Sequence, residues 1–177
     1  MAQTHPIVAA LQDRILLVDG AMGTMIQAHE LEEEDFRGSS FADHPNALKG
    51  NNDLLSITQP EIIADIHRRF LDAGSDIIST NTFNSTSISM ADYAMEAEVY
   101  NINVPAARLA NKVVAEFNER EPSKPRYVLG VLGPTNKTLS ISPDVNDPGF
   151  RGITWAEMVA PNQQQCYQHL LCYFAMP

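Results

Sequence analysis

The sequence has little of what membrane proteins, disulfide-stabilised proteins and nucleic-acid-binding proteins need. No segment of its 177 residues approaches the roughly 20 apolar residues that span a bilayer. Its two cysteines, Cys166 and Cys172, lie close together in the last part of the chain and form no disulfide framework. Lys and Arg number 12 against 22 Asp and Glu, so the net charge of -10 repels phosphate backbones and anionic lipid. We therefore expect no nucleic-acid partner, no membrane partner and a cytoplasmic location.

What the sequence does contain indicates an α/β protein. Hydrophobic residues make up 44% and charged residues 19%, which is the balance of a globular domain. Continuous apolar runs at 15–19, 76–83 and 127–132 each end on small or polar residues, as buried parallel strands do. Two long polar stretches, 30–57 and 136–153, are expected to be loops. Strands alternate with helical patterns, which predicts a parallel sheet with helices outside; three strands alone do not distinguish a doubly wound sheet from a barrel.

The helix after the first polar stretch has clear signals at both ends. Thr58 with Glu61 three residues later forms a capping box, and Gly74 is expected to end the helix. Isoleucine, leucine and phenylalanine recur between them at helical spacing and give one apolar face. We assign His67 to the opposite, outer face.

Prolines interrupt both later helical patterns. Pro105 falls inside an amphipathic pattern over 94–118 and predicts a kink or a split there. Thr154 and Glu157 form a second capping box that opens another helix. Pro161 follows about two turns later, where proline costs roughly 3 kcal/mol in a helix interior.

Polar side chains gather where the expected strands end, which is where α/β folds bind ligands. The three ends are Asp19–Gly20, Thr80–Thr82 and Gly133–Thr135. Together they offer one carboxylate, hydroxyl and amide groups, and glycines that let a ligand approach the backbone. This set suits a small zwitterion, whose ammonium needs a carboxylate. The alternative for Asp19–Gly20 is a tight turn after the strand, and the spacing of Gly20 and Gly23 does not match a phosphate-binding loop.

Ten short motifs occur in the same order as in one enzyme family, and the resemblance covers roughly residues 7 to 160. They are Val18–Met25, Asp35–Gly38, Phe41–Pro45, Leu48–Leu55, Gln59–Ile63, Gly74–Ile78, Thr80–Asn84, Tyr100–Asn103, Ala107–Ala110 and Val131–Asn136. The chain resembles the homocysteine S-methyltransferases, and among them the N-terminal homocysteine-binding domain of cobalamin-dependent methionine synthases.

The resemblance implies a (β/α)8 TIM barrel that binds homocysteine at its mouth and holds the substrate sulfur on zinc as a thiolate. In that family the methyl group comes from methylcobalamin, which methyltetrahydrofolate recharges on separate cobalamin and folate domains. By the same resemblance, Asp19 contacts the homocysteine ammonium and Thr80 and Asn81 hold the amino-acid end. The implied substrate-binding residues are Asp19, Gly20, Ala21, Met22, Thr80 and Asn81. No catalytic residue is assigned.

The chain also departs from that family. A complete barrel needs about 250 residues, so the fold expected here is an incomplete TIM barrel made of the first three βα units. Residues 1–160 form the N-terminal part of the barrel, and residues 161–177 form a tail that does not match the family. Our hypothesis is that a frameshift, intron read-through or alternative splicing produced this tail. The family's three zinc cysteines are absent, and Cys166, His169 and Cys172 have none of the usual zinc spacings.

Three functional hypotheses follow. In the first, the chain belongs to a methionine synthase that converts homocysteine to methionine, and it is inactive alone because neither zinc nor cobalamin is expected to bind it. In the second, it is a non-catalytic fragment or a residual binding or interaction module. In the third, it belongs to a betaine-dependent homocysteine methyltransferase. The loop Leu48–Leu55 and the motif Thr80–Asn84 favour the cobalamin type by resemblance.

Overall fold

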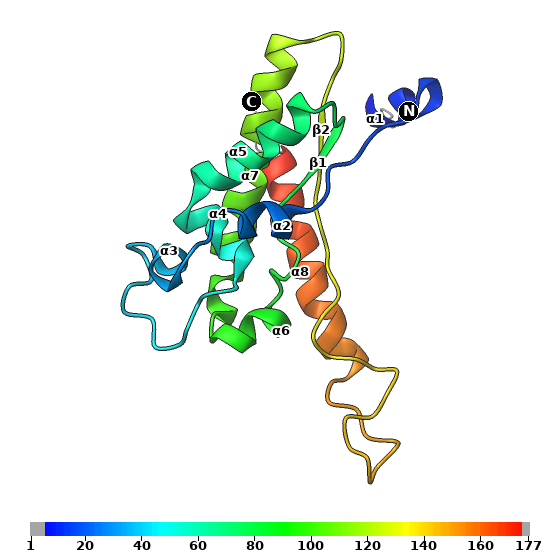
Figure 1. The fold of residues 1–177 in the computed structure, drawn as a ribbon. Helices are drawn as coiled ribbons and strands as arrows, with labels where there is room; N and C mark the ends of the chain where they lie inside the picture. Colours follow the sequence, from blue (N-terminus) through cyan, green and yellow to red (C-terminus); the bar gives the residue numbers. More distant parts are fainter. Residues whose placement is uncertain (1–5, 175–177) are drawn as a thin grey trace.

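The protein is known from a computed structural model, which describes residues 6–174, with side chains as far as Leu170 (Figure 1). The α-helices are α1 (Pro6–Asp13), α2 (Met22–Gln27), α3 (Glu33–Arg37), α4 (Leu55–Thr58), α5 (Pro60–Asp72), α6 (Ser87–Met90), α7 (Val99–Arg120) and α8 (Trp155–Phe174). The strands are β1 (Ile77–Ser79) and β2 (Tyr127–Leu129), and short 3-10 helices cover Asn52–Leu54, Ala91–Tyr93 and Glu96–Glu98. None of the helices in the described part of the chain is long and apolar enough to cross a membrane.

The strands β1 and β2 pair in parallel, with Ile77 opposite Tyr127 and Ser79 opposite Leu129. A single parallel bridge joins Val18 to Ile77 on the other side of β1. Two of the three expected strands are therefore present in shortened form, and the first is reduced to one residue pair. The expectation of three complete βα units is not confirmed.

The first strand stays short because no second layer covers its side chains. Ile15 is 85% exposed and Leu17 58% exposed. Hydrogen bonds from the N–H groups of Asp76 and Ile77 to the Leu17 carbonyl still tie this segment to β1, at 2.8 and 3.0 Å. A continuous apolar run predicts a strand whose side chains are covered on both faces of the sheet. In the described structure, Ile15 and Leu17 are not covered in this way.

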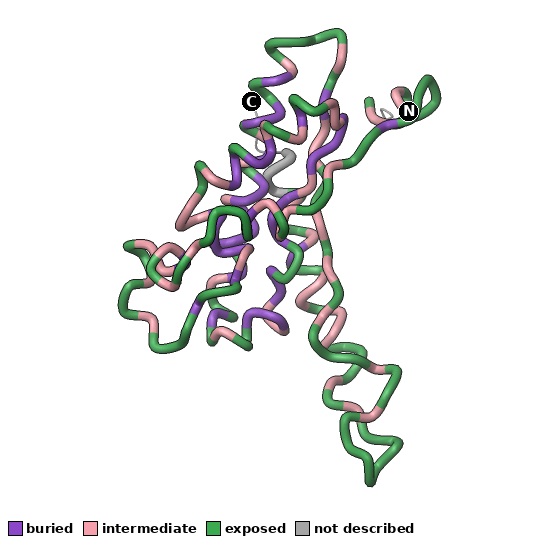
Figure 2. The backbone as a smooth tube through the Cα atoms, in the orientation of Figure 1, coloured by how far each residue is buried: buried purple, intermediate pink, exposed green. Residues whose placement is uncertain are grey.

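Most of the core lies among α4, α5 and α7, which we call the helical layer (Figure 2). The fully buried apolar side chains of this core include Leu55, Ile63, Ile66 and Ile102 from the helical layer, and Leu48 and Leu54 from the segment before it. The prediction that residues 30–57 form a loop is wrong in part, because this stretch contains α3, a 3-10 helix and the start of α4. Its few apolar residues are spaced too widely to show a period, yet they are the ones that enter the core.

The start of α5 differs from its predicted capping box. The helix begins at Pro60, with Gln59 as N-cap and no side-chain capping bond. Thr58 instead ends α4, and its hydroxyl reaches the Leu54 carbonyl at 3.5 Å. Proline at the first helical position has no N–H left unsatisfied, so it starts the helix without a cap. The predicted end is confirmed, because Gly74 follows the C-cap with a φ of 112°.

The assignment of His67 to an outer face is wrong. Its side chain is 0% exposed, and neither ring nitrogen has a hydrogen-bond partner among the described residues. Burial lowers the pKa of His67 to about 4, so the ring is neutral at pH 7. The apolar face of a helix does not mark all of its buried positions, because a helix that is packed on two sides also buries residues outside that face.

Neither internal proline ends its helix. Helix α7 runs through Pro105 and α8 runs through Pro161. In α7 the side chains of Val104 and Ala106 on either side of the proline are buried, so packing outweighs the lost hydrogen bond. The capping box of Thr154 and Glu157 is confirmed at the start of α8, with hydrogen bonds of 2.7 and 3.3 Å.

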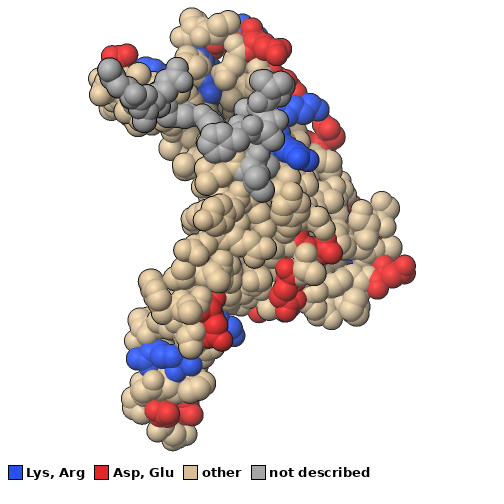
Figure 3. Space-filling view, turned by 180° about the vertical axis from the view of Figure 1, so that it is seen from behind, with Lys and Arg blue, Asp and Glu red and all other residues tan. Residues whose placement is uncertain are grey.

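The loop 136–153 extends away from the body of the molecule, and none of its residues is buried (Figures 1 and 2). Figure 3 shows one face of the molecule, on which acidic and basic side chains gather toward the ends and a broad uncharged band lies between them. The loop lies outside the well-packed helical layer.

Candidate active site

The candidate site is a pocket of about 210 Å³ at the carboxyl end of β1. Its lining residues are Asp19, Gly20, Ala21, Met22, Ser79, Thr80, Asn81, Phe83 and Val131. All six residues expected to bind substrate thus line one pocket, although their role in binding remains a prediction. Sequence reasoning missed the other three. Ser79 directly precedes Thr80 in the run 76–83 and Val131 lies near the end of the run 127–132, and these positions were the signal that could have found both residues.

Asp19 is the charged side chain of this pocket. Its Oδ2 accepts a hydrogen bond from the Ser79 N–H at 2.9 Å, and its own N–H donates to the Ile77 carbonyl at 2.9 Å. Its Oδ1 is buried and has no partner among the described residues. Burial raises the pKa of the Asp19 carboxyl, and the hydrogen bond from Ser79 opposes that rise. The carboxylate is therefore held in place with one oxygen left for a further donor.

The backbone of residues 20–22 turns sharply beside Asp19. Ala21 has a φ of 48°, in the left-handed region that residues with a Cβ seldom adopt. It directly precedes α2, and its carbonyl accepts from the Met25 N–H at 3.0 Å. A Cβ added at Gly20 would meet nothing within 4 Å, so the space beside this residue is open to a ligand.

Thr80 and Asn81 form the buried wall of the pocket, with exposures of 4% and 5%. The Asn81 amide donates to the Asn52 carbonyl at 2.8 Å and to the Ser56 hydroxyl at 3.2 Å. The Thr80 hydroxyl accepts from the Val131 N–H at 3.0 Å. These bonds fix both side chains, so they define the shape of the pocket before any ligand enters.

Asp53 supports the segment that follows the pocket. It is 2% exposed, and its Oδ2 accepts from the Asn84 N–H at 2.6 Å and the Ser85 hydroxyl at 2.7 Å. Burial raises the pKa of Asp53 to about 6. Sequence reasoning missed this role; a carboxylate directly before the apolar pair Leu54 and Leu55 was the available signal.

Comparison with known proteins identifies the family. The sequence model of the family described as homocysteine S-methyltransferase matches residues 16–172. The chain belongs to this family. The matched range runs into the segment 161–177.

The homocysteine S-methyltransferase fold is also found among solved structures. The structure of homocysteine methyltransferase MmuM from Escherichia coli in its metallated form superposes with a TM-score of 0.69 at 19% identity, covering 95% of this chain and 54% of that protein. The oxidized form of the same protein superposes with a TM-score of 0.69 at 20% identity, covering 96% and 54%. This chain therefore spans about half the length of these proteins, consistent with a fragment of a TIM-barrel methyltransferase.

The family's zinc does not fit the described side chains. Among them, no three His, Cys, Asp or Glu residues gather closely enough to hold a metal ion. Asp19 is the one carboxylate in the pocket wall, and Cys166 is a free, half-buried thiol on α8. Cys172 lies outside the described side chains.

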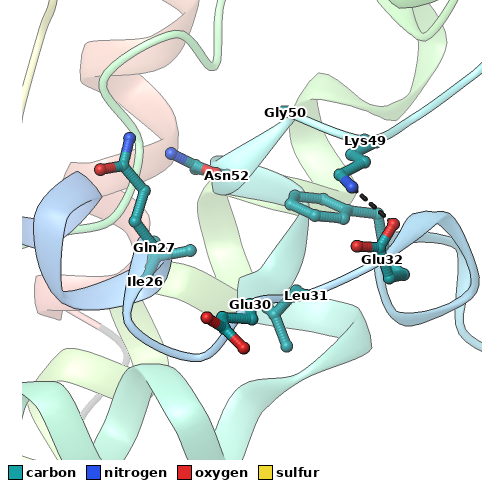
Figure 4. Close-up of a pocket in the computed structure, with 9 residues that line it drawn as sticks. Ile26, Gln27, Glu30, Leu31, Glu32, Lys49, Gly50 and Asn52 are labelled. Carbon is teal, nitrogen blue, oxygen red and sulfur yellow. Dashed lines mark hydrogen bonds and ion pairs between the residues drawn. The ribbon is translucent and has the colours of Figure 1, made fainter.

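A larger hollow of about 420 Å³ lies between α2 and α3 (Figure 4). The side chains of Ile26 and Leu31 contribute to its wall, and Lys49 Nζ pairs with Glu32 Oε2 at 2.5 Å at one side. Since Lys49 already has a carboxylate partner and the strand ends lie elsewhere, this hollow is a poorer candidate for the homocysteine S-methyltransferase site than the Asp19 pocket.

Proposed function

We propose that this chain binds the amino-acid end of homocysteine for a homocysteine S-methyltransferase. The observation that carries the proposal is the Oδ1 atom of Asp19, which is unpartnered among the described residues on a side chain that lines the pocket. The ammonium of an amino acid satisfies such an oxygen with a charge-assisted hydrogen bond. Membership of the family supports homocysteine as the amino acid.

The remaining lining residues complete the proposed contact. The open backbone of Gly20, Ala21 and Met22 lies beside the carboxylate, and Thr80 and Asn81 close the pocket from β1. Because these walls are fixed by hydrogen bonds within the protein, binding requires little reorganisation. This favours a preformed site for a small zwitterion.

For the whole protein, we propose the methionine synthase reaction with methylcobalamin as methyl donor. The motifs Leu48–Leu55 and Thr80–Asn84 support this by resemblance. We further propose that the chain alone does not turn over. A free thiol has a pKa of about 8.5, so only a few per cent is the reactive thiolate at neutral pH without a metal or base to ionise it. Methyl transfer from methylcobalamin to homocysteine by the isolated chain would overturn this part.

Calorimetric titration with homocysteine tests the binding proposal. We expect Asp19→Asn to weaken binding about 10- to 100-fold, because a hydrogen bond to a charged group is lost. The control is Asp65→Asn, which neutralises an exposed carboxylate on α5 and should leave the affinity unchanged. 4-Mercaptobutyrate, which lacks the ammonium, should bind weakly to both the unmodified chain and Asp19→Asn. Equal affinity of Asp19→Asn and the unmodified chain for homocysteine would contradict the proposal.

A second candidate is a non-catalytic interaction module, favoured by the exposed apolar side chains of the strand region. Ile15 is 85%, Leu129 49% and Leu132 46% exposed. Thermal unfolding distinguishes the two candidates. A cooperative transition that homocysteine shifts upward supports the binding site, whereas broad melting with binding of a hydrophobic dye supports an unclosed module.

A further inference from the structure

A chain of hydrogen bonds joins α8 to the wall of the Asp19 pocket. His169 Nε2 lies 3.1 Å from the Thr82 hydroxyl, which lies 2.7 Å from the Thr80 hydroxyl. The Thr80 oxygen in turn accepts from the Val131 N–H at 3.0 Å. Thr80 and Val131 both line the pocket, so a side chain on α8 is linked to it without touching it.

The donor and acceptor of each of these hydrogen bonds can be assigned, because each hydroxyl carries only one hydrogen. The Thr82 hydroxyl donates its one hydrogen to the Val131 carbonyl at 3.1 Å. Its oxygen must then accept from both Thr80 and His169. Thr80 thereby donates to Thr82 and accepts from Val131, and His169 must carry a hydrogen on Nε2. Every hydroxyl hydrogen in the chain is used once, and the Thr80 oxygen is held in a single orientation.

The His169 ring is seated tightly against the strand backbone. A Cβ added at Gly130 would lie 2.7 Å from His169 Nδ1, which is closer than real contacts allow. Gly130 follows β2 and precedes Val131, so its missing side chain is what lets the ring approach this strand end. The position of the ring is therefore set by the fold as well as by its hydrogen bond.

Gln165, one turn earlier on α8, anchors the same two strand ends. Its side chain is 0% exposed, and its amide donates to the carbonyls of Thr82 at 2.6 Å and Val131 at 3.3 Å. Figure 1 shows this end of α8 beside α7 and the strands. Residues four apart share one helix face. His169 and Gln165 therefore both bond to Thr82 from that face, and Gln165 also bonds to Val131.

We propose that His169 is a positioning residue of the homocysteine pocket, which holds Thr80 and Val131 in place through Thr82. This inference rests on the proposed function, because it names a residue that shapes that site. It gives the segment after Pro161 a role in binding, although none of the described side chains of that segment lines the Asp19 pocket.

Two readouts on the full chain test the proposal, namely the homocysteine dissociation constant and the ¹H–¹⁵N shift of the Val131 amide. The shift reports the hydrogen bond to Thr80 without any ligand. We expect His169→Ala to move that shift and to weaken binding about fivefold, the loss expected for one hydrogen bond. His169→Gln, whose amide can still donate to Thr82, should restore both values. Tyr167→Ala, an exposed change on the same helix, should alter neither.

A double variant separates positioning from general stabilisation. If His169 acts through Thr82, His169→Ala combined with Thr82→Val should bind no more weakly than Thr82→Val alone. Additive losses in binding, or an unchanged Val131 shift in His169→Ala, would overturn the inference. If the unmodified chain binds no homocysteine, the proposed function fails, and the Val131 shift alone then decides whether His169 holds this strand end.

Discussion

The helical layer buries its apolar side chains, whereas several apolar side chains in the segments on either side of β1 are exposed. In α5 and α7 the side chains of Ile63, Ile66 and Ile102 are all 0% exposed. Around the sheet, Leu17 is 58% and Leu129 49% exposed. In a closed (β/α)8 barrel the strands face an interior packed with side chains from all the strands, while neighbouring helices pack directly on one another. Half of such a barrel can therefore complete its helical layer but not its strand layer.

Truncating one side chain in each layer tests this comparison, and here we expect the largest effect. Ile102→Ala should lower the free energy of unfolding by about 2–5 kcal/mol, because it removes buried methyl groups and leaves a cavity. Leu129→Ala should lower it by less than about 1 kcal/mol, because the side chain is already half exposed. Urea denaturation followed by circular dichroism measures both. Equal losses would mean that the strands are covered in solution.

Asp53, in the 3-10 helix before α4, accepts hydrogen bonds from the segment after β1 and should make stability depend on pH. Its pKa is raised from 3.8 to about 6, so its stabilising contribution is complete below about pH 4 and is lost as the pH rises through 6. Relative to the unmodified chain, Asp53→Asn should gain about 2 kcal/mol of unfolding free energy between pH 4 and 7. The exposed Asp43→Asn serves as the control. A difference between Asp53→Asn and the unmodified chain that stays constant with pH would contradict the raised pKa.

His67, inside the helical layer, should have the opposite pH dependence. Its pKa is lowered from 6.5 to about 4, so the folded state loses stability as the pH falls from 6.5 towards 4. Between pH 7 and 5, the free energy of unfolding should fall by about 2 kcal/mol less in His67→Leu than in the unmodified chain. His29→Leu, at an exposed ring, provides the comparison. If acid weakens His67→Leu as much as the unmodified chain, another group is responsible.

The sequence was informative about the site because its signals are local. In parallel strands the carboxyl ends meet at one edge, so Asp19 and Thr80–Asn81 could be placed together from the positions at which apolar runs stop. Their hydrogen-bond partners could not be predicted. Asn52 and Ser56 come from a stretch without periodicity, and which of their atoms face Asn81 depends on tertiary packing.

The errors of the sequence analysis arise where distant contacts outweigh local preference. Pro161 disfavours a helix locally, yet the buried Gln165 and Gln168 tie the following turns to the body of the protein. The reverse holds at 15–19, where the local preference for a strand is strong but neighbours are lacking. Propensity scales describe a residue and its near neighbours, so neither outcome could be read from the sequence.

The smallest effect is expected where the helices leave the packed body. The Thr154–Glu157 capping box opens α8 next to the exposed loop 136–153, and Thr154 itself is exposed. Thr154→Ala should lower the free energy of unfolding by only about 0.5–1 kcal/mol, as at other helix N-caps. Thr138→Ala, which removes an exposed hydroxyl from that loop, should change it less.

Hydrogen exchange of the α8 amides shows which part of the helix is destabilised in Thr154→Ala. We expect faster exchange in the first turn after Thr154 and unchanged exchange near His169, because the second half of α8 is held by the strand ends rather than by its cap. If exchange rises along the whole helix, α8 unfolds as one unit. Its contacts with Thr82 and Val131 would then depend on the N-cap.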